Sequence, residues 1–177
     1  MNINETLKHY FGYDSLRPGQ QELIEGILQR KDVLGIMPTG AGKSLCYQVP
    51  ALMLDGITIV VSPLISLMTD QVKALNQAGV HAAYINSSLT ENQIRTALFY
   101  AAQGRYKIIY VAPERLNTIR FLEFACQVDI SMVTVDEAHC ISQWGQDFRP
   151  SYVGIADFLA QLPKRPVVSA FTATATE

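Results

Sequence analysis

The sequence predicts an α/β fold, a mostly parallel, doubly wound sheet with helices on both faces, and three observations favour it. Short runs rich in Val and Ile alternate with longer segments that have a helical period. The short runs are apolar on both faces, as in strands that are covered from both sides. Strand–helix alternation also favours right-handed crossovers between parallel strands.

The six expected strands take short apolar runs, of which the third has the weakest pattern. In chain order they are residues 32–37, 57–62, 82–87, 107–112, 131–137 and 167–173. The expected helices are residues 19–30, a helix that starts near Lys43, and residues 64–78, 90–103, 116–126 and 152–162. Pro18 suits the first turn of the first helix, while Thr90 and Gly104 suit the two ends of residues 90–103.

Composition excludes several classes of protein. The 177 residues are 49% apolar and 17% charged, which excludes intrinsic disorder. The net charge of -2 excludes a histone-like coat, so any nucleic-acid surface must be local. Cys46, Cys126 and Cys140 show no CxxC spacing, which predicts buried, reduced thiols and no zinc in this segment. No apolar run reaches the roughly 18 residues of a membrane span, and no signal peptide is present, so we expect a cytoplasmic protein without a membrane partner.

The strongest local signal is MPTGAGKS, residues 37–44, between an expected strand and an expected helix. That context predicts a phosphate-binding loop. Its glycines allow backbone N–H groups to converge on an anion, Lys43 can reach the terminal phosphates, and Ser44 can offer its hydroxyl to Mg²⁺. The expected nucleotide-binding residues are Thr39, Gly40, Ala41, Gly42, Lys43 and Ser44. Met37 departs from the general pattern, and the alternative is a Gly-rich turn before a helix.

The run SMVTVDEAH ends an expected buried strand with two carboxylates. Ligands bind at the carboxyl ends of such strands. Asp136 fits a metal-holding carboxylate, acting through water, and Glu137 fits the group that orients and deprotonates an attacking water. His139 follows at once, which suggests a coupling role. The alternative is a solvated acidic strand end. The long stretch without periodicity at residues 139–151 is expected to be a functional loop.

TGAGKS together with DEAH resembles the first motor domain of superfamily two helicases. LKHYFGYDSLRPGQ, SPLISLMTDQV, APERL, DEAHCISQWGQDFRPSY and FTATAT together look like the RecQ family of DNA helicases, in the family's order and over essentially the whole chain. Leu16, Gln146 and Phe171 depart from residues that are common in the family, and none of these changes removes a catalytic group. The resemblance implies a RecA-like P-loop fold.

The resemblance also implies roles for single residues. In FGYDSLRPGQ, Tyr13 would stack on adenine, while Arg17 and Gln20 would hold the nucleotide. The amide of Gln20 has the donor and acceptor that an adenine edge requires. Lys43, Asp136, Glu137 and His139 would be the catalytic residues. The residues implied in nucleic-acid contact or in coupling are Ser62, Pro63, Leu64, Trp144, Phe148, Arg149, Thr172 and Thr174. Aromatic rings suit stacking on unpaired bases, and Arg149 can reach a phosphate.

By this resemblance, residues 1–30 would be N-terminal helices with the adenine-reading motif, and residues 31–177 a RecA-like ATP-binding motor domain. The expected activity is an ATP- and Mg²⁺-dependent DNA helicase, 3′ to 5′, on single-stranded and forked DNA in repair and recombination. The family's second motor domain, with its arginine finger, does not follow, so we expect one domain of a longer protein that alone binds Mg–ATP weakly and unwinds nothing. The alternatives are a DEAD/DEAH-type RNA helicase domain, a non-helicase P-loop ATPase and a non-catalytic adaptor.

Overall fold

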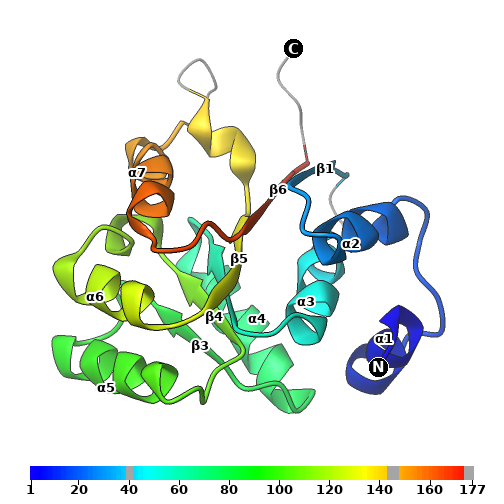
Figure 1. The fold of residues 1–177 in the computed structure, drawn as a ribbon, viewed down its shortest axis with the longest axis horizontal. Helices are drawn as coiled ribbons and strands as arrows, with labels where there is room; N and C mark the ends of the chain where they lie inside the picture. Colours follow the sequence, from blue (N-terminus) through cyan, green and yellow to red (C-terminus); the bar gives the residue numbers. More distant parts are fainter. Residues whose placement is uncertain (39–41, 143–147, 174–177) are drawn as a thin grey trace.

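The computed structural model describes residues 1–38, 42–142 and 148–173, and its core is one six-stranded sheet in which every strand pair is parallel (Figure 1). The strands are β1 (Val33–Ile36), β2 (Ile57–Val61), β3 (Ala82–Ile85), β4 (Ile108–Val111), β5 (Ile130–Val135) and β6 (Val167–Thr172). Their order across the sheet is β1-β6-β5-β2-β4-β3. The expected parallel α/β architecture is confirmed.

Seven helices lie among the described residues. They are α1 (Ile3–Phe11), α2 (Gln20–Leu28), α3 (Lys43–Met53), α4 (Ile65–Gln77), α5 (Glu91–Ala102), α6 (Ile119–Gln127) and α7 (Gly154–Gln161). Short 3₁₀ turns cover Pro113–Arg115, Ala138–Ile141 and Pro150–Tyr152. The expectation for Pro18 is wrong. Gly19, in the left-handed region at φ +87°, is the N-cap of α2, so Pro18 lies in the turn before the helix.

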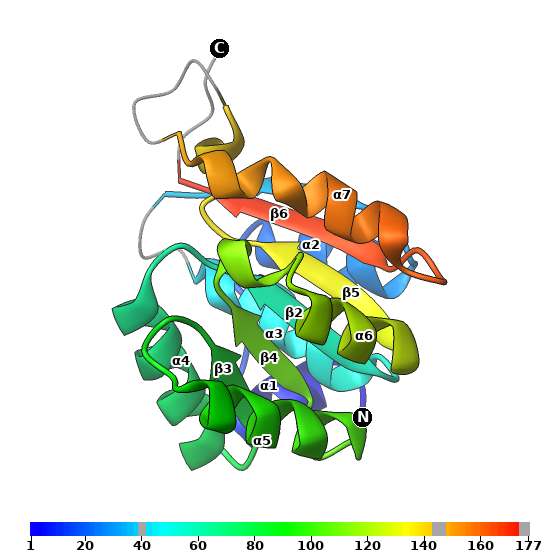
Figure 2. The same ribbon diagram turned by 90° about the vertical axis from the view of Figure 1, so that its left-hand side faces the viewer.

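Helices cover both faces of the sheet. Figure 2 shows α5, α6 and α7 in front of the sheet and α1, α2 and α3 behind it. The apolar residues of α2, α3 and α4 form one core cluster with strand residues such as Val60 and Phe171. Helix α1 makes an outer layer, because Leu7 packs with Ile24 of α2 and Val49 of α3. No helix among the residues described here is long and apolar enough to cross a membrane.

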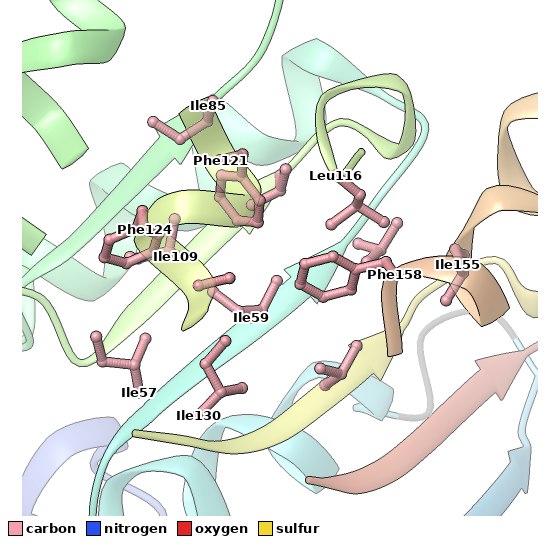
Figure 3. Packing of buried hydrophobic residues seen from close by; sticks show 14 of the residues in the cluster. Ile57, Ile59, Ile85, Ile109, Leu116, Phe121, Phe124, Ile130, Ile155 and Phe158 are labelled. Carbon is pink, nitrogen blue, oxygen red and sulfur yellow. The ribbon is translucent and has the colours of Figure 1, made fainter. Parts of the chain in front are cut away.

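The other face carries the larger aromatic core (Figure 3). Ile59 of β2 is fully buried below α6 and α7, which contribute Phe121 and Phe158 with ring centroids 5.8 Å apart. Burial of a Phe side chain stabilises the fold by about 1.5–3 kcal/mol. These contacts stabilise the centre of the sheet. Strand β5 lies there, and its carboxyl end leads directly into Asp136 and Glu137.

The expectation that all three thiols are buried is wrong for Cys126, which is exposed, whereas Cys46 and Cys140 are buried.

The first expected strand differs from the expectation that it is buried. Leu34 and Ile36 of β1 are 61% and 53% exposed. Leu34 and Ile36 point to the same face of β1, because side chains alternate along a strand, while Gly35 between them lies against Phe171 and Leu23. One face of β1 is therefore packed and the other is largely exposed among the described residues. The apolar run therefore predicts a strand correctly here, but it does not predict that both faces of the strand are covered by helices.

Thr90 caps α5 as expected, and its removal should destabilise the chain. The Thr90 hydroxyl accepts a hydrogen bond from the Gln93 N–H at 3.2 Å, and the Gln93 side chain accepts one from the Thr90 N–H at 2.8 Å. Loss of such a cap costs about 1 kcal/mol. Thr90→Ala should therefore lower Tm by about 2–4 °C in a thermal melt. Thr96→Ala, on the exposed face of the same helix, should leave Tm unchanged or raise it. Equal effects of the two changes would contradict the capping role.

Candidate nucleotide-binding site

The candidate site lies at the carboxyl edge of the sheet. Strand β1 leads into residues 37–42, and β5 ends directly before Asp136 and Glu137. Because all strands run in parallel, their carboxyl ends meet at this one edge. A cavity of about 340 Å³ opens there. Its lining consists of Tyr13, Ser15, Arg17, Gln20, Gly42, Lys43, Ser44, Leu45, Tyr47, Leu67, Gln71 and Asp136.

Gly42 ends the expected phosphate loop and caps α3. Its φ of +75° lies in the left-handed region, which side chains with a Cβ rarely adopt. A Cβ on Gly42 would also lie 2.4 Å from Nε2 of Gln20. The positive end of α3 faces the same edge, where it favours an anion. The expected residues Thr39, Gly40 and Ala41 lie outside the described residues.

Lys43 joins the phosphate loop to the acidic pair. Its Nζ donates to Oε1 of Glu137 at 2.9 Å and lies 3.5 Å from Oδ1 of Asp136. Burial favours the neutral amine, but the hydrogen bond with Glu137 and the charges of both carboxylates outweigh it and raise the pKa of Lys43. The lysine is therefore charged, and without nucleotide its charge is balanced by the two carboxylates. A phosphate that enters the loop has to compete with them for this ammonium.

Asp136 is a buried carboxylate, only 4% exposed. Burial raises its pKa, and the neighbouring Lys43 offsets part of that shift. One carboxylate oxygen, Oδ1, accepts a hydrogen bond from the Glu137 N–H at 2.9 Å. The buried hydroxyl of Tyr152 donates to the Asp136 carbonyl at 2.8 Å and so fixes the backbone at the strand end. Asp136 is held rigidly with its charge only partly balanced, which is the state expected of a metal-holding group.

Glu137 has a strained backbone. Its φ of +52° and ψ of +47° place it in the left-handed region, which costs a residue with a Cβ about 1–3 kcal/mol. The Cys140 N–H donates to its carbonyl at 3.0 Å and closes the 3₁₀ turn that follows. This backbone turns the Glu137 carboxylate toward Lys43. Strain of this kind is often found at functional sites.

His139 connects the acidic pair to β6. Its Nδ1 lies 2.9 Å from Oγ1 of Thr172 and 3.5 Å from Oε2 of Glu137. The hydroxyl of Thr172, one of the residues that the resemblance implies in nucleic-acid contact or in coupling, therefore contacts His139, which closely follows the acidic pair. The other expected hydroxyl, that of Thr174, lies outside the described residues.

The adenine-reading motif touches the phosphate loop directly, which the sequence did not indicate. Gln20 is 1% exposed, and its Oε1 accepts from the Arg17 N–H at 2.7 Å. Its Nε2 donates to the Gly42 carbonyl at 3.0 Å. Tyr13 is 55% exposed and lines the cavity. Gln20 thus joins the segment before α2 to Gly42, the N-cap of α3.

The residues expected to contact nucleic acid differ in exposure. Ser62 is 1% exposed, while Leu64 is 43% exposed and immediately precedes α4. A direct contact from this turn would therefore come from Leu64, from the half-buried Pro63 or from the backbone in this conformation. Arg149 is exposed, and its N–H donates to the Cys140 carbonyl at 3.0 Å. Trp144 lies outside the described residues.

The residues present fit a Mg²⁺ ion. Ser44 and Asp136 both line the cavity, and hydroxyl and carboxylate oxygens are the ligands that Mg²⁺ prefers. The Ser62 hydroxyl is buried without a hydrogen-bond partner among the described residues. Val61 pairs with Val135, so Ser62 and Asp136 follow neighbouring positions at the sheet edge. A buried hydroxyl without a partner beside a buried carboxylate is what a hydrated ion would satisfy.

The raised pKa of Asp136 predicts that this residue costs the folded chain stability. A carboxyl whose pKa is raised by folding is penalised while it is ionised, and the penalty disappears as the pH falls toward 3.8, its ordinary pKa. Asp136→Asn should therefore raise Tm of the nucleotide-free chain at pH 7 in Mg²⁺-free buffer, with a smaller gain near pH 4. Asp70→Asn, at an exposed site on α4, is the matched control. A lower Tm at pH 7 would show that pairing with Lys43 outweighs the burial penalty.

Fold and site define a RecA-like P-loop domain, and comparison with known proteins agrees. A family model described as "DEAD/DEAH box helicase" matches residues 17–177. The chain belongs to the DEAD/DEAH box helicase family.

The chain is similar to curated proteins named ATP-dependent DNA helicase RecQ. It is 53% identical to the one from Bacillus subtilis and 47% identical to the one from Haemophilus influenzae, over 96% of the chain in each case. It spans only 29% and 27% of their lengths. A crystal structure titled as a hypothetical ATP-dependent RNA helicase from Sulfolobus tokodaii aligns with a TM-score of 0.75 at 22% identity, covering 100% of this chain and 52% of that one. This last likeness supports the fold alone.

Proposed function

We propose that this chain is the nucleotide-binding motor domain of an ATP-dependent DNA helicase. One observation carries the proposal. Lys43 lies within 2.9 Å of Glu137 and 3.5 Å of Asp136, at a cavity that Tyr13 and Gln20 also line. Phosphate-binding, metal-holding and base-reading groups thus share one cavity. We place residues 1–30 with base recognition and residues 31–177 with phosphate chemistry.

In this proposal the described side chains divide the work of hydrolysis. Lys43 leaves the carboxylates and binds the terminal phosphates, which frees Glu137 to accept a proton from the attacking water. Ser44 and Asp136 would hold Mg²⁺, which supplies positive charge against the phosphate oxygens. His139, which contacts the Thr172 hydroxyl, orients the side chain of Glu137. In the same proposal, Tyr13 stacks on the adenine base, and Arg17 and Gln20 hold the nucleotide.

The choice of DNA as the partner rests on the RecQ-named relatives, which are called DNA helicases. We propose that single-stranded and forked DNA passes the turn Ser62–Leu64 and the segment that contains Trp144, Phe148 and Arg149. The chain spans under a third of these relatives. We therefore propose that a second motor domain closes over the phosphates and supplies an arginine. Movement from 3′ to 5′, and a role in DNA repair and recombination within the cell, belong to the same proposal.

Phosphate release by the full-length protein tests the proposal. It is measured with single-stranded DNA, with RNA of the same sequence and without nucleic acid. We expect stimulation by DNA and little by RNA. Stimulation by RNA alone would favour an RNA helicase. A rate of ATP hydrolysis that neither DNA nor RNA changes would favour a non-helicase P-loop ATPase. Absence of nucleotide binding would favour an adaptor.

Trp144 should matter for stimulation by DNA and not for basal turnover. Its position in an aromatic sequence directly after DEAH motivates this expectation. Stacking of a base on an aromatic side chain contributes about 1–3 kcal/mol. Trp144→Ala should therefore raise the DNA concentration for half-maximal ATPase by about 5- to 150-fold. Trp144→Phe should retain most of the stimulation. An equal loss of turnover with and without DNA would indicate a structural anchor instead.

A further inference from the structure

Four buried or half-buried polar side chains of α3, β4 and α4 form a hydrogen-bonded chain, which we call the α3–α4 relay. Its members are Tyr47 and Gln48 of α3, Tyr110 of β4 and Gln71 of α4. The hydroxyls of Tyr47 and Tyr110 are 3.0 Å apart. The Gln48 amide donates to the Tyr110 hydroxyl at 3.0 Å and to Oε1 of Gln71 at 2.9 Å.

The relay lies in surroundings that favour apolar side chains. Tyr47 and Tyr110 are each 1% exposed, and Gln48 is 4% exposed. Burial raises the pKa of Tyr110 to about 12 and that of Tyr47 well above its usual range, so both hydroxyls keep their protons. Buried polar groups stabilise a fold only while they are paired, and apolar side chains would fill the same space without that condition. Within the relay, the bond from Gln48 to Gln71 joins α3 directly to α4, and the bonds to Tyr110 tie Tyr47 and Gln48 to β4.

The two ends of the relay lie at two parts of the proposed machinery. Helix α3 begins at Lys43, so Gln48 is about 7.5 Å further along the same helix, at 1.5 Å per residue. Helix α4 begins at Ile65, directly after the turn Ser62–Leu64. Tyr47 and Gln71 also line the nucleotide cavity.

We propose that the α3–α4 relay transmits nucleotide occupancy from the phosphate loop to the turn Ser62–Leu64, with Gln48 and Gln71 as its positioning residues. The inference rests on the proposed function. A phosphate that draws Lys43 away from Glu137 and Asp136 changes the position of the first turn of α3. Gln48 moves with this helix. Helix α4 follows, because otherwise the buried Gln48 amide loses a partner. The turn before α4 is then repositioned against the DNA strand.

Backbone amide NMR shifts of the 177-residue chain test the relay. The chain is titrated with Mg²⁺ and a non-hydrolysable ATP analogue, and shifts are followed at Lys43 and Ser44 and at residues 64–66. The main variant is Gln48→Leu, which has nearly the same shape, removes both amide bonds and does not line the cavity. Gln77→Leu makes the same change as the main variant at an exposed site on α4.

In the unchanged chain we expect shifts at both sets of residues. Gln48→Leu should abolish the shifts at residues 64–66 while Kd for the analogue changes less than about twofold, or about 0.4 kcal/mol. Gln77→Leu should keep them. A Gln48→Leu chain that has a lower Tm but unchanged shifts at residues 64–66 would show a purely structural network and overturn the inference. Shifts at Lys43 alone in the unchanged chain would also overturn it. If the analogue binds nowhere, the proposed function fails first.

Discussion

Replacing Glu137 with Gln should leave Mg–ATP binding nearly intact and lower the rate of hydrolysis by about 10²- to 10⁴-fold, the contribution of a positioned general base. Gln has almost the same shape, and its oxygen can still accept from Lys43, which is 2.9 Å from the Glu137 carboxylate. It cannot take a proton from water at neutral pH. Single-turnover phosphate release and equilibrium binding of a fluorescent ATP analogue, on the full-length protein, separate the two effects.

Two further variants sharpen this result. Lys43→Ala should weaken nucleotide binding as well as turnover, because it removes the cation that meets the phosphates. Glu123→Gln, which makes the same chemical change on the exposed surface of α6, should alter neither quantity. Normal DNA-stimulated turnover by the Glu137→Gln protein would refute the assignment of Glu137 as the base. The αL backbone of Glu137 would then need another explanation.

The sequence predicts the positions of the strands well because most of them are short apolar runs rich in Val or Ile. Helix ends are predicted where a local side chain determines them, as with the capping box of Thr90. The exposure of Leu34 and Ile36 is not predictable in this way, because it depends on which elements pack over that face of β1 in the folded chain. Local pattern reports which residues form a strand and says little about what covers it.

In the candidate site, too, some features can be predicted from local sequence and others cannot. Its phosphate loop and acidic pair are each contiguous in sequence, so their residue types and spacing reveal them. The bond from Gln20 to Gly42 joins residues 22 positions apart, and the relay joins Gln48 to Tyr110 across 62 positions. No local pattern encodes such pairs. The available signal was the presence of Gln48 and Gln71 within otherwise apolar helix faces, where an amide needs a partner.

Gly42→Ala should damage the site more than its small size suggests. A residue with a Cβ in the left-handed region costs about 1–2 kcal/mol. The new Cβ would also lie 2.4 Å from Nε2 of Gln20, so the Gln20 side chain or the loop has to move. Either movement breaks the hydrogen bond to the Gly42 carbonyl and disturbs the N–H groups that would meet the phosphates. We expect Kd for Mg–ATP to rise about 10- to 100-fold, since hydrogen bonds to charged groups contribute about 1.5–3 kcal/mol each.

A matched glycine separates the backbone penalty from the contact with Gln20. Gly104 has φ +79°, close to the +75° of Gly42, and a Cβ there would meet nothing within 4 Å. Gly104→Ala should lower Tm by the backbone penalty alone and leave nucleotide binding unchanged. The double change Gly42→Ala with Gln20→Ala removes the clash, so its effect on Tm should be smaller than the sum of the two single changes. Strict additivity of the Gly42 and Gln20 changes would show that the two residues act independently, and the link between the base-reading motif and the phosphate loop would then have no energetic role.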